Sequence, residues 1–461
     1  MNADTFDLAI IGGGPAGYSA ALLAAKYGKK VVLFESDHVG GTCLNVGCIP
    51  TKYLADKASV IDRIRQLSEE KIFDQAGRFS YRKIQQGKQE TVEKLVSGVE
   101  NLLKSAKVTV IKGEAKLIDH NLVECNSEKY DSLNVLISTG SVSWFPDIPG
   151  SEGNIIGSTE ALALEKVPGS TVIIGGGVIG LELASIFSSF GSKIVVVELL
   201  DELLPKEDRN AITEMRKLLV KKGITITTSA KNLSISVNGG KKKVEFEKSG
   251  EKLQAEADCI IGATGRRASL KGIDAKKLGL QLDAKGNIIV DGNMKTNIPG
   301  VYAAGDVVGG WQLAHAAYKE AEIAVNGMFG KEGSVDETPM PRCVYTNPPV
   351  ASVGITIQEA SAAGKECIVG SFPYAANGMA LAEGARDGTA WVIIDKKTGE
   401  VLGAHIVGTG STELIGTAAM AIATKTTASQ WAEMIVAHPT LSEILHEAAM
   451  SCVGRSVHKF R

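Results

Sequence analysis

The stretch TFDLAIIGGGPAGYSAALLAAKYGKKVVLFE (residues 5–35) sets the fold at the start of this chain. It opens with a short apolar run, continues through three glycines spaced G-x-G-x-x-G, and passes through an alanine-rich segment into a second apolar run. Short apolar runs bounded by glycine are typical of buried strands, and the alanine-rich segment favours a helix. The pattern predicts a strand–turn–helix–strand unit with parallel strands. Its glycines are Gly12, Gly14 and Gly17, and Glu35 ends the second strand.

The same plan recurs in TVIIGGGVIGLELASIFSSFGSKIVVVE (residues 171–198). In both copies 23 residues separate the first glycine from the acid, from 12 to 35 and from 175 to 198. One such glycine motif is a weak signal, but two copies with the same context and spacing argue against glycine-rich turns without a ligand. The second copy supplies Gly175, Gly177, Gly180 and Glu198.

Each copy is suited to binding a dinucleotide. The first glycine permits a tight turn, the second lets the backbone approach a pyrophosphate, and the third lets the helix pack on the strand. The helix N-terminus binds phosphate, and the acid accepts hydrogen bonds from ribose hydroxyls. No basic residue follows Glu198 before Lys206 and Arg209, so the second site favours NAD over NADP. The patterns alone do not say which site holds which cofactor.

Length and composition are those of an ordinary globular protein. The 461 residues suffice for about three domains, and the formal charge of −2 favours neither nucleic acid nor a membrane surface as a partner. The first residues are acidic where a signal peptide is basic, and no apolar stretch is long enough to span a membrane. Five of the seven cysteines are scattered singly, unlike a secreted disulfide framework. We therefore expect a cytoplasmic protein.

The other two cysteines, Cys43 and Cys48, stand close together in GGTCLNVGCIPTK (residues 40–52). They could be buried thiols, half of a zinc site, a structural disulfide or a dithiol that cycles. No further zinc ligands stand nearby, so we expect no metal, and a structural disulfide is uncommon in a reducing compartment. A straight helix would separate the pair by about 7.5 Å, beyond the roughly 6.8 Å Cα limit for a disulfide, so the glycines must permit an irregular turn. A helix N-terminus lowers a thiol pKa, which favours the redox-active dithiol.

Two further segments, TNIPGVYAAGDVVGGWQLAHAAYKEA (296–321) and VAHPTLSEILHEA (436–448), make the chain recognisable. With the cysteine segment and the two glycine motifs, they resemble the flavin-dependent pyridine nucleotide–disulfide oxidoreductases over essentially the whole length. Within that family the chain is most similar to the enzymes that oxidise dihydrolipoyl groups. The resemblance implies an α/β fold with two Rossmann-like dinucleotide-binding domains, for FAD and NAD, and a C-terminal α/β dimerisation domain.

The resemblance also implies domain boundaries and cofactor contacts. The first glycine motif with Glu35 would bind FAD, and the second with Glu198 would bind NAD. Asp306 would hydrogen-bond the ribityl chain of the flavin, although by its place after a glycine it could also be only a turn residue. Thr139, Gly140, Gly265 and Ala314 are the other expected cofactor contacts. The expected domains are 1–145 (FAD), 146–267 (NAD), 268–340 (a central segment completing the FAD domain) and 341–461 (dimerisation).

Four of the expected catalytic residues lie near the flavin in this resemblance. Cys48 would lie nearer the flavin, and Cys43 would exchange with substrate. Lys52 would sit beside the flavin ring, paired with Glu182, where its positive charge favours reduced flavin. From the residues alone, Lys52 would more commonly be a solvated surface lysine and Glu182 an exposed helical acid.

His438 is the candidate base, because a thiol must lose its proton before it attacks a disulfide. Glu443 stands five residues on and could orient the imidazole, but Thr440-x-x-Glu443 also fits a helix capping box. The residues alone leave these two roles open, and the resemblance favours the His–Glu pair. It further implies that His438 serves the cysteines of a neighbouring subunit, so that the enzyme is a homodimer.

The implied reaction is the oxidation of dihydrolipoyl groups to lipoyl by NAD⁺ through a Cys43–Cys48 disulfide and FAD. The partners would be lipoyl domains of 2-oxo acid dehydrogenase or glycine-cleavage complexes, or free dihydrolipoamide. An NADPH-dependent reductase of glutathione-like disulfides is a second possibility, but Glu198 argues against it. A third is a non-catalytic flavoprotein subunit, against which the joint presence of both cysteines, Lys52 and His438 argues.

Overall fold

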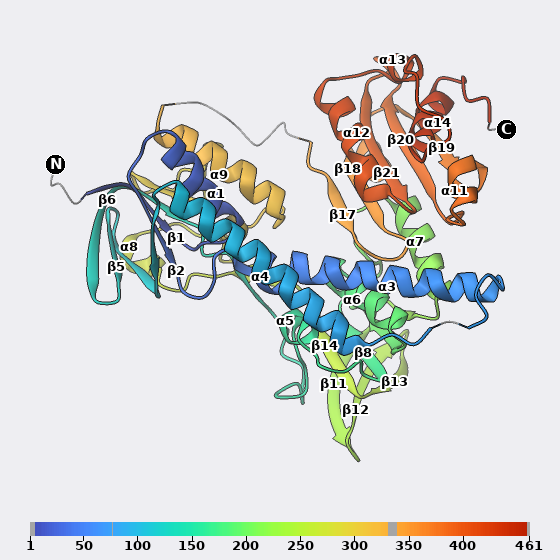
Figure 1. Ribbon diagram of the computed structural model, residues 1–461, viewed down its shortest axis with the longest axis horizontal. Helices are drawn as coiled ribbons and strands as arrows, with labels where there is room; N and C mark the ends of the chain where they lie inside the picture. The colour runs from blue at the N-terminus through green and yellow to red at the C-terminus, as the bar shows by residue number, and fades with distance from the viewer. Residues whose placement is uncertain (1–4, 76, 331–338, 459–461) are drawn as a thin grey trace.

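The computed structural model describes residues 5–75, 77–330 and 339–458. Figure 1 shows sheet-based units at the left, the lower right and the upper right, with long helices crossing between them. The predicted α/β class is confirmed, because parallel strands alternate with helices in the first two of these units. Within the described ranges, none of the helices has the length and apolar composition needed to cross a membrane.

The first sheet is built around β1 (Phe6–Ile11), which pairs in parallel with β2 (Val31–Glu35) and with β6 (Glu128–Ile137). Helix α1 (Pro15–Lys26) packs against α9 (Ala314–Met328), and both bury alanines, which lets the two helices approach closely. The strand order is β3-β2-β1-β6-β5-β4, with β16 beside β6. The remaining strands are β3 (Thr109–Lys112), β4 (Ala115–Asp119), β5 (Leu122–Cys125) and β16 (Val301–Ala303).

Three helices follow β2 before the chain returns to this sheet. They are α2 (Gly41–Val46), α3 (Cys48–Glu69) and α4 (Tyr81–Ser105). The chain leaves the helical conformation between α3 and α4. The side chain of Ser80 accepts a hydrogen bond from the Lys83 N–H and so caps the start of α4.

The second sheet has four parallel strands in the order β10-β9-β8-β14. Its helices are α6 (Val178–Ser189), which is buried along most of its length, and α7 (Arg209–Lys221). An antiparallel three-stranded sheet, β11-β12-β13, extends downward from it in Figure 1. The strands are β8 (Ser170–Ile174), β9 (Lys193–Val197), β10 (Thr225–Thr227), β11 (Lys231–Asn238), β12 (Lys241–Lys248), β13 (Glu251–Ala257) and β14 (Cys259–Gly262).

The third sheet is antiparallel, in the order β17-β18-β21-β20-β19, and packs against α14 (Ser442–Cys452) and α12 (Ser411–Ala423). Its strands are β17 (Arg342–Val344), β18 (Val350–Gly354), β19 (Cys367–Pro373), β20 (Thr389–Asp395) and β21 (Val401–Val407). The shorter elements of the chain are α5 (Ser158–Leu162), α8 (Ala275–Leu278), α10 (Ile357–Ala362), α11 (Gly378–Ala382), α13 (Ala428–Ala432), η1 (Asp306–Val308) and η2 (Tyr374–Ala376), with the two-stranded ribbon of β7 (Ser141–Ser143) and β15 (Arg266–Ala268).

The sheets group the chain much as the domain prediction does, but the boundaries themselves stay a prediction. Strands of the first sheet come from 6–137 and from 301–303, so the chain returns to it after the second sheet. The expected boundary at 267 falls inside β15, and β15 pairs with β7 from the other side of the 145 boundary. Both strands of this ribbon therefore lie where the chain passes between the first and the second sheet, β7 on the way out and β15 on the way back.

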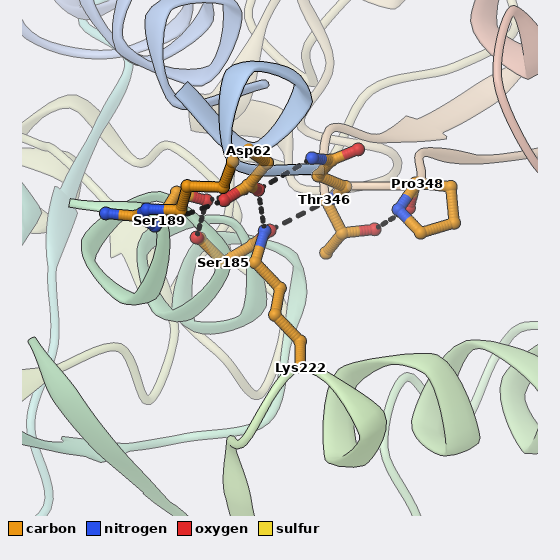
Figure 2. A network of polar contacts seen from close by, with 8 residues as sticks. Asp62, Ser185, Ser189, Lys222, Thr346 and Pro348 are labelled. Carbon is orange, nitrogen blue, oxygen red and sulfur yellow. Dashed lines mark hydrogen bonds and ion pairs between the residues drawn. The ribbon is translucent and has the colours of Figure 1, made fainter. Parts of the chain in front are cut away.

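A polar seam, formed by Asp62, Ser185, Ser189, Lys222 and Asn347, holds α3 against α6 (Figure 2). Oδ2 of Asp62 on α3 accepts from Nζ of Lys222 at 2.5 Å, from Oγ of Ser189 at 2.7 Å and from Nδ2 of Asn347 at 2.8 Å. The Asn347 N–H donates to Oγ of Ser185 at 2.9 Å. One carboxylate thus joins α3, α6, the end of α7 and the segment before β18. Burial lowers the pKa of Lys222, against the raising effect of the Asp62 charge.

We expect Asp62→Ala to lower the free energy of unfolding by about 2–3 kcal/mol, because it leaves the ammonium of Lys222 without its counterion. The side chain of Lys222 is only 15% exposed and that of Asp62 only 22%, so water cannot fully solvate the ammonium group that loses its partner. Urea unfolding followed by circular dichroism measures the change.

Glu366→Ala is the matched control, because Glu366 and Lys396 form an exposed ion pair whose loss should change stability little. The double variant Asp62→Leu/Lys222→Met should recover much of the loss, since it removes both charges. A single Asp62→Ala variant as stable as the control would contradict this account of the seam.

Candidate active site

The first glycine loop connects β1 to α1 in a geometry that only glycine accepts. Gly12 has φ +105°, and a Cβ there would lie 2.3 Å from the Ser138 carbonyl oxygen. A Cβ at Gly17 would lie 1.8 Å from the Gly12 carbonyl oxygen, so α1 rests directly on the loop. The carboxylate of Glu35 accepts the N–H of Gly13 at 2.7 Å and that of Asp37 at 2.8 Å. The carboxylate of Glu35 is therefore held against the backbone of the glycine loop.

The second loop, between β8 and α6, repeats this arrangement. Gly175 has φ +115°, and a Cβ at Gly180 would lie 2.1 Å from the Gly175 carbonyl oxygen. The carboxylate of Glu198 accepts the N–H groups of Gly176 and Leu200. The two acids thus occupy equivalent places relative to their loops.

Both loops leave the space that a dinucleotide requires. A Cβ at Gly177 would meet no atom within 4 Å, and one at Gly14 only the Gly41 Cα at 3.9 Å. Gly14 and Gly177 are also the N-caps of α1 and α6, and neither helix start is capped by a side chain. Backbone N–H groups at an uncapped helix start are free to bind phosphate. The residues present therefore fit a dinucleotide at each loop.

Two other expected cofactor contacts follow parallel strands of the first sheet: Thr139 comes just after β6, and Asp306 just after β16. Asp306 begins η1, and its Oδ2 accepts from Oγ of Ser141 at 2.5 Å. The Nε of Arg266 donates to the same Oγ at 2.7 Å and lies 3.8 Å from the Asp306 carboxylate. Thr139 is tied by its hydroxyl to the Ser269 carbonyl at 2.5 Å. Asp306 is thus held by side chains of the β7–β15 ribbon.

The three small residues among the expected cofactor contacts leave room for a ligand. Gly140 has φ +70° and Gly265 has φ +130°, and a Cβ at either would meet no atom within 4 Å. Ala314 is the first residue after the N-cap of α9, which has no side-chain cap. Gly265 follows Ala263 and Thr264, whose backbone borders the second glycine loop at Gly175, whereas Gly140 follows Thr139, whose backbone borders the first loop at Gly12.

The two close cysteines lie on consecutive helices. Cys43 is inside α2, Cys48 begins α3, and Gly47 breaks the helix between them with φ −137° and ψ −103°. The irregular turn that the sequence required is therefore present, with its break at Gly47. Both residues are free thiols in the structure.

The two thiols have opposite pKa shifts. The hydrogen bond from the Cys43 thiol lowers the pKa of Cys48 to about 7, helped by the Lys52 charge and opposed by burial. The same hydrogen bond, together with burial, raises the pKa of Cys43. Cys48 is therefore the sulfur that carries the negative charge in the dithiol form.

Lys52 pairs with Glu182 across the contact between α3 and α6. Its Nζ lies 3.1 and 3.0 Å from the two carboxylate oxygens, and it stands 4.3 Å over the Tyr345 ring. The Tyr345 N–H donates to Oε1 of Glu182 at 2.9 Å. Glu182 is only 4% exposed, so it is not the exposed helical acid that its sequence position alone suggested.

His438 and Glu443 form a hydrogen-bonded pair at the start of α14. Nδ1 of His438 lies 2.9 Å from Oε1 of Glu443, and Oε2 of Glu443 accepts the Thr440 N–H at 2.8 Å. The Thr440 hydroxyl donates instead to the Ala437 carbonyl. Glu443 therefore binds the imidazole and completes one half of a capping box at the same time.

Among the described residues, neither His438 nor Glu443 forms a hydrogen bond or ion pair with Cys43 or Cys48. The His438 side chain is 76% exposed, and α14 lies in the upper-right unit of Figure 1, away from α1 and the first sheet. The charges that act on the cysteines are instead those of Lys52, Glu182 and Asp306. Within the described ranges, no cluster of three or more possible ligands is placed to hold a metal ion.

Four further side chains lie near these groups without any signal in the sequence. Tyr345 supports Lys52, and Glu320 accepts the Gly305 N–H at 2.7 Å, next to Asp306. Burial raises the pKa of Glu320 to about 7. The hydroxyls of Tyr18 and Tyr318 lie 2.6 Å apart, and burial raises the pKa of both. No local pattern marks these residues, because their partners are remote in the sequence.

We expect Lys52→Gln to raise the pKa of Cys48 by roughly one unit, because the lysine charge stabilises the thiolate. The rate of iodoacetamide alkylation of the reduced protein, followed against pH with mass spectrometry of residues 43 and 48, measures the shift. Lys57→Gln is the control, since Lys57 lies on the same helix but pairs with Asp56. An alkylation midpoint that stays near pH 7 in Lys52→Gln would contradict the electrostatic account.

Comparison with known proteins covers nearly the whole chain. Residues 6–321 match the family described as pyridine nucleotide-disulphide oxidoreductase, and residues 340–449 match its dimerisation domain. A dihydrolipoyl dehydrogenase of Bacillus subtilis (strain 168) is 39% identical over 98% of this chain and 99% of that protein. One of Geobacillus stearothermophilus is 36% identical over 97% and 96%.

Among solved structures, the HOCl-induced flavoprotein disulfide reductase RclA from Escherichia coli superposes with a TM-score of 0.86. It is 29% identical and covers 96% of this chain and 99% of its own. Its Cu(II) complex gives a TM-score of 0.87 at the same identity, with 97% of this chain and 99% of that one covered. The glycine loops, the paired cysteines and these matches agree, and the chain belongs to the pyridine nucleotide–disulphide oxidoreductase family.

Proposed function

We propose that this protein oxidises dihydrolipoyl groups to lipoyl groups with NAD⁺. The observation that carries the proposal is the Cys43–Cys48 pair at the start of α3, with its asymmetric thiols and the charge of Lys52 beside it. The relatives that match over nearly the whole chain carry the name dihydrolipoyl dehydrogenase. Members of the family use FAD and NAD. FAD would supply a route for two electrons from the dithiol to the nicotinamide.

The two glycine loops divide the cofactors between them in this proposal. The loop of Gly12 and Gly14, with Glu35, Asp306, Thr139 and Gly140, would hold FAD, and Ala314 would border it. Gly265 would border the second loop. The loop of Gly175, Gly177 and Gly180, with Glu198, would hold NAD. Oxygens of Glu198 can accept from the ribose hydroxyls of NAD, and the carboxylate would repel the 2′-phosphate of NADP.

The asymmetry of the thiols supports a direction for the exchange reaction. A substrate thiolate would attack Sγ of Cys43 in the Cys43–Cys48 disulfide, forming a mixed disulfide and releasing Cys48. Cys48 is the better leaving group, because its pKa is about 7 and a lower pKa favours departure. The second substrate thiolate would then attack its own mixed-disulfide sulfur, close the lipoyl ring and release Cys43. The substrate loses two protons and two electrons, and the protein gains two thiols.

His438 would accept the proton of the substrate thiol. Burial raises the pKa of Glu443, but the Thr440 N–H, the hydrogen bond from His438 and the nearby imidazole charges lower it overall. The carboxylate therefore stays ionised at neutral pH and stabilises an imidazolium at His438. Glu443 also holds Nδ1, which leaves Nε2 to face the substrate.

A homodimer would bring His438 to the cysteines of the second chain. The residues just before His438 present apolar side chains to solvent: Ile435 is fully exposed and Met434 is half exposed. Exposed apolar surface of this kind is typical of an interface. Residues 340–449 match the dimerisation domain of the family, which supports the same arrangement. A cytoplasmic location is part of this proposal, since the scattered free cysteines suit a reducing compartment.

The partners would be lipoyl domains of multienzyme complexes, or free dihydrolipoamide. An NADPH-dependent reductase of glutathione-like disulfides would share the cysteines and His438, so the choice between the two rests on Glu198. A non-catalytic subunit would not need Cys48 to be stabilised as a thiolate. The pKa shift of Cys48 therefore favours an enzyme over a binding module.

We expect the purified holoenzyme to reduce NAD⁺ with dihydrolipoamide far faster than NADP⁺, and to reduce oxidised glutathione with NADPH little. Cys43→Ser and Cys48→Ser should each lower turnover by at least about 10³-fold, because neither can form the disulfide. Cys367→Ser is the control, since Cys367 lies on β19 in the third sheet. Turnover in the glutathione assay alone would contradict both the substrate and the role of Glu198.

His438→Gln should lower kcat by about 10²- to 10⁴-fold. If the active site spans two chains, mixed dimers of His438→Gln with Cys48→Ser should regain about half of the wild-type activity, because one of the two sites is then intact. Co-expression with two different affinity tags isolates these dimers. Mixed dimers as inactive as their parents would show that the site lies within one chain.

A further inference from the structure

The turn after β16 carries Asp306, and one of its buried backbone groups needs a partner from outside the sheet. The Ala304 N–H still donates to the Ile137 carbonyl at 3.1 Å, beside the pairing of β16 with β6. The N–H of Gly305, one residue farther on, donates to no backbone carbonyl in the described ranges, although Gly305 is buried. A buried N–H without an acceptor is strongly unfavourable, so the turn depends on a side chain.

That side chain is Glu320 on α9. Its Oε2 accepts the Gly305 N–H at 2.7 Å, and Glu320 is only 6% exposed. In the described part of the chain, neither a lysine, an arginine nor a histidine pairs with this carboxyl. Burial raises the pKa of Glu320 to about 7, because the charged form loses its hydration. A buried carboxyl without a counterion opposes folding, which makes its single contact a candidate for a functional role.

The same turn is packed tightly between α1 and α9. Gly305 has φ +81°, and a Cβ there would lie 3.3 Å from Cβ of Ala16 and 3.7 Å from Cβ of Ala317. Ala16 belongs to the first turn of α1, directly after the first glycine loop. Ala317 lies three residues before Glu320, on the same face of α9. The first glycine loop and the face of α9 that carries Glu320 therefore meet at this turn.

The contact to Glu320 is next to the carboxylate of Asp306 along the chain. Asp306 follows Gly305 directly and is held by Oγ of Ser141 at 2.5 Å, with Nε of Arg266 at 3.8 Å. These two partners belong to the β7–β15 ribbon, whereas Glu320 belongs to α9. The turn is thus fixed from two sides, by the ribbon through the Asp306 side chain and by α9 through the backbone.

We propose that Glu320 is a positioning residue for the flavin site, whose carboxyl oxygen holds the Gly305 N–H and so fixes the turn in the conformation in which Asp306 binds FAD. This rests on the proposed function only in placing FAD at the first glycine loop and in giving Asp306 a hydrogen bond to it. Position 320 then requires an acceptor oxygen at this distance, and it does not require a negative charge, because burial disfavours the charged form.

Glu320→Ala should weaken the binding of FAD to the apoprotein by about 10-fold. Without the acceptor, the turn would rearrange to bring the Gly305 N–H to water, and FAD would bind only the molecules that keep the native turn. Glu320→Gln keeps an acceptor oxygen on a side chain of the same length, so its affinity should stay within about twofold of wild type. Glu320→Asp keeps the charge but is one methylene shorter, so it should resemble Glu320→Ala.

The experiment uses the full-length chain, stripped of FAD and titrated with FAD while the anisotropy of flavin fluorescence is followed. Glu322→Ala is the matched control, because Glu322 lies on the same helix but is 48% exposed and pairs with Lys319. Urea unfolding followed by circular dichroism establishes that each apoprotein is folded. The affinity for NAD⁺, measured by calorimetry, should be the same in all variants, since the second glycine loop is not involved.

A double-mutant cycle tests whether Glu320 acts through Asp306. Asp306→Ala should itself weaken FAD binding, and adding Glu320→Ala should then weaken it little further, because the turn no longer carries the group that it positions. A loss in the double variant equal to the sum of the two single losses would overturn the proposal, since the two residues would then act independently.

Weak FAD binding in Glu320→Ala and Glu320→Asp, with near wild-type binding in Glu320→Gln and Glu322→Ala, would support the proposal. Wild-type affinity in a folded Glu320→Ala apoprotein would overturn it, as would a Glu320→Gln affinity as weak as that of Glu320→Asp. The comparison of Gln with Asp decides the matter even if Glu320→Ala does not fold. None of these measurements uses dihydrolipoamide, so a chain that follows them without oxidising dihydrolipoamide would refute the proposed function alone.

Discussion

The ion pair between Lys52 and Glu182 is the contact on which the arrangement of this protein depends. It joins α3, which begins at the reactive cysteine, to α6, which begins at the second glycine loop. The backbone of Tyr345 completes the contact from the segment that leads into the third sheet. Glu182 is buried and Lys52 is partly buried, so removing either charge would leave the other without its counterion and destabilise the fold. The positive charge of Lys52 therefore stays beside the thiols. The polar seam around Asp62 holds α3 and α6 together nearer their C-terminal ends.

The two cysteines beside this contact have identical side chains but different surroundings. Cys43 and Cys48 differ in that Cys48 starts a helix and receives the hydrogen bond of its neighbour. A difference in pKa between two sulfurs determines which one leaves when the disulfide is attacked. In the proposed reaction, the direction of exchange would therefore follow from the hydrogen bond that Cys48 receives from Cys43, while the Lys52 charge lowers the pKa of both thiols.

The acids of this protein serve local structure and chemistry at once. Glu35 and Glu198 each accept a backbone N–H of a glycine loop, and in the proposed sites their remaining lone pairs would accept from a ribose. Glu443 caps Thr440 with one oxygen and orients His438 with the other. The capping box and the His–Glu pair were alternatives in the sequence, and the structure forms the His–Glu pair together with the Glu443 half of the box.

Much of the fold and half of the site follow from local rules. The glycine positions are readable because a left-handed φ or a helix resting on a loop excludes every larger residue, whatever lies elsewhere. The cysteine spacing and the acid after each strand are local in the same sense. The burial of Glu182, the place of Tyr345 and the contact of Asp62 with Lys222 join residues more than a hundred positions apart. The local sequence cannot predict such contacts, because they form only when the sheets pack and bring α3 against α6.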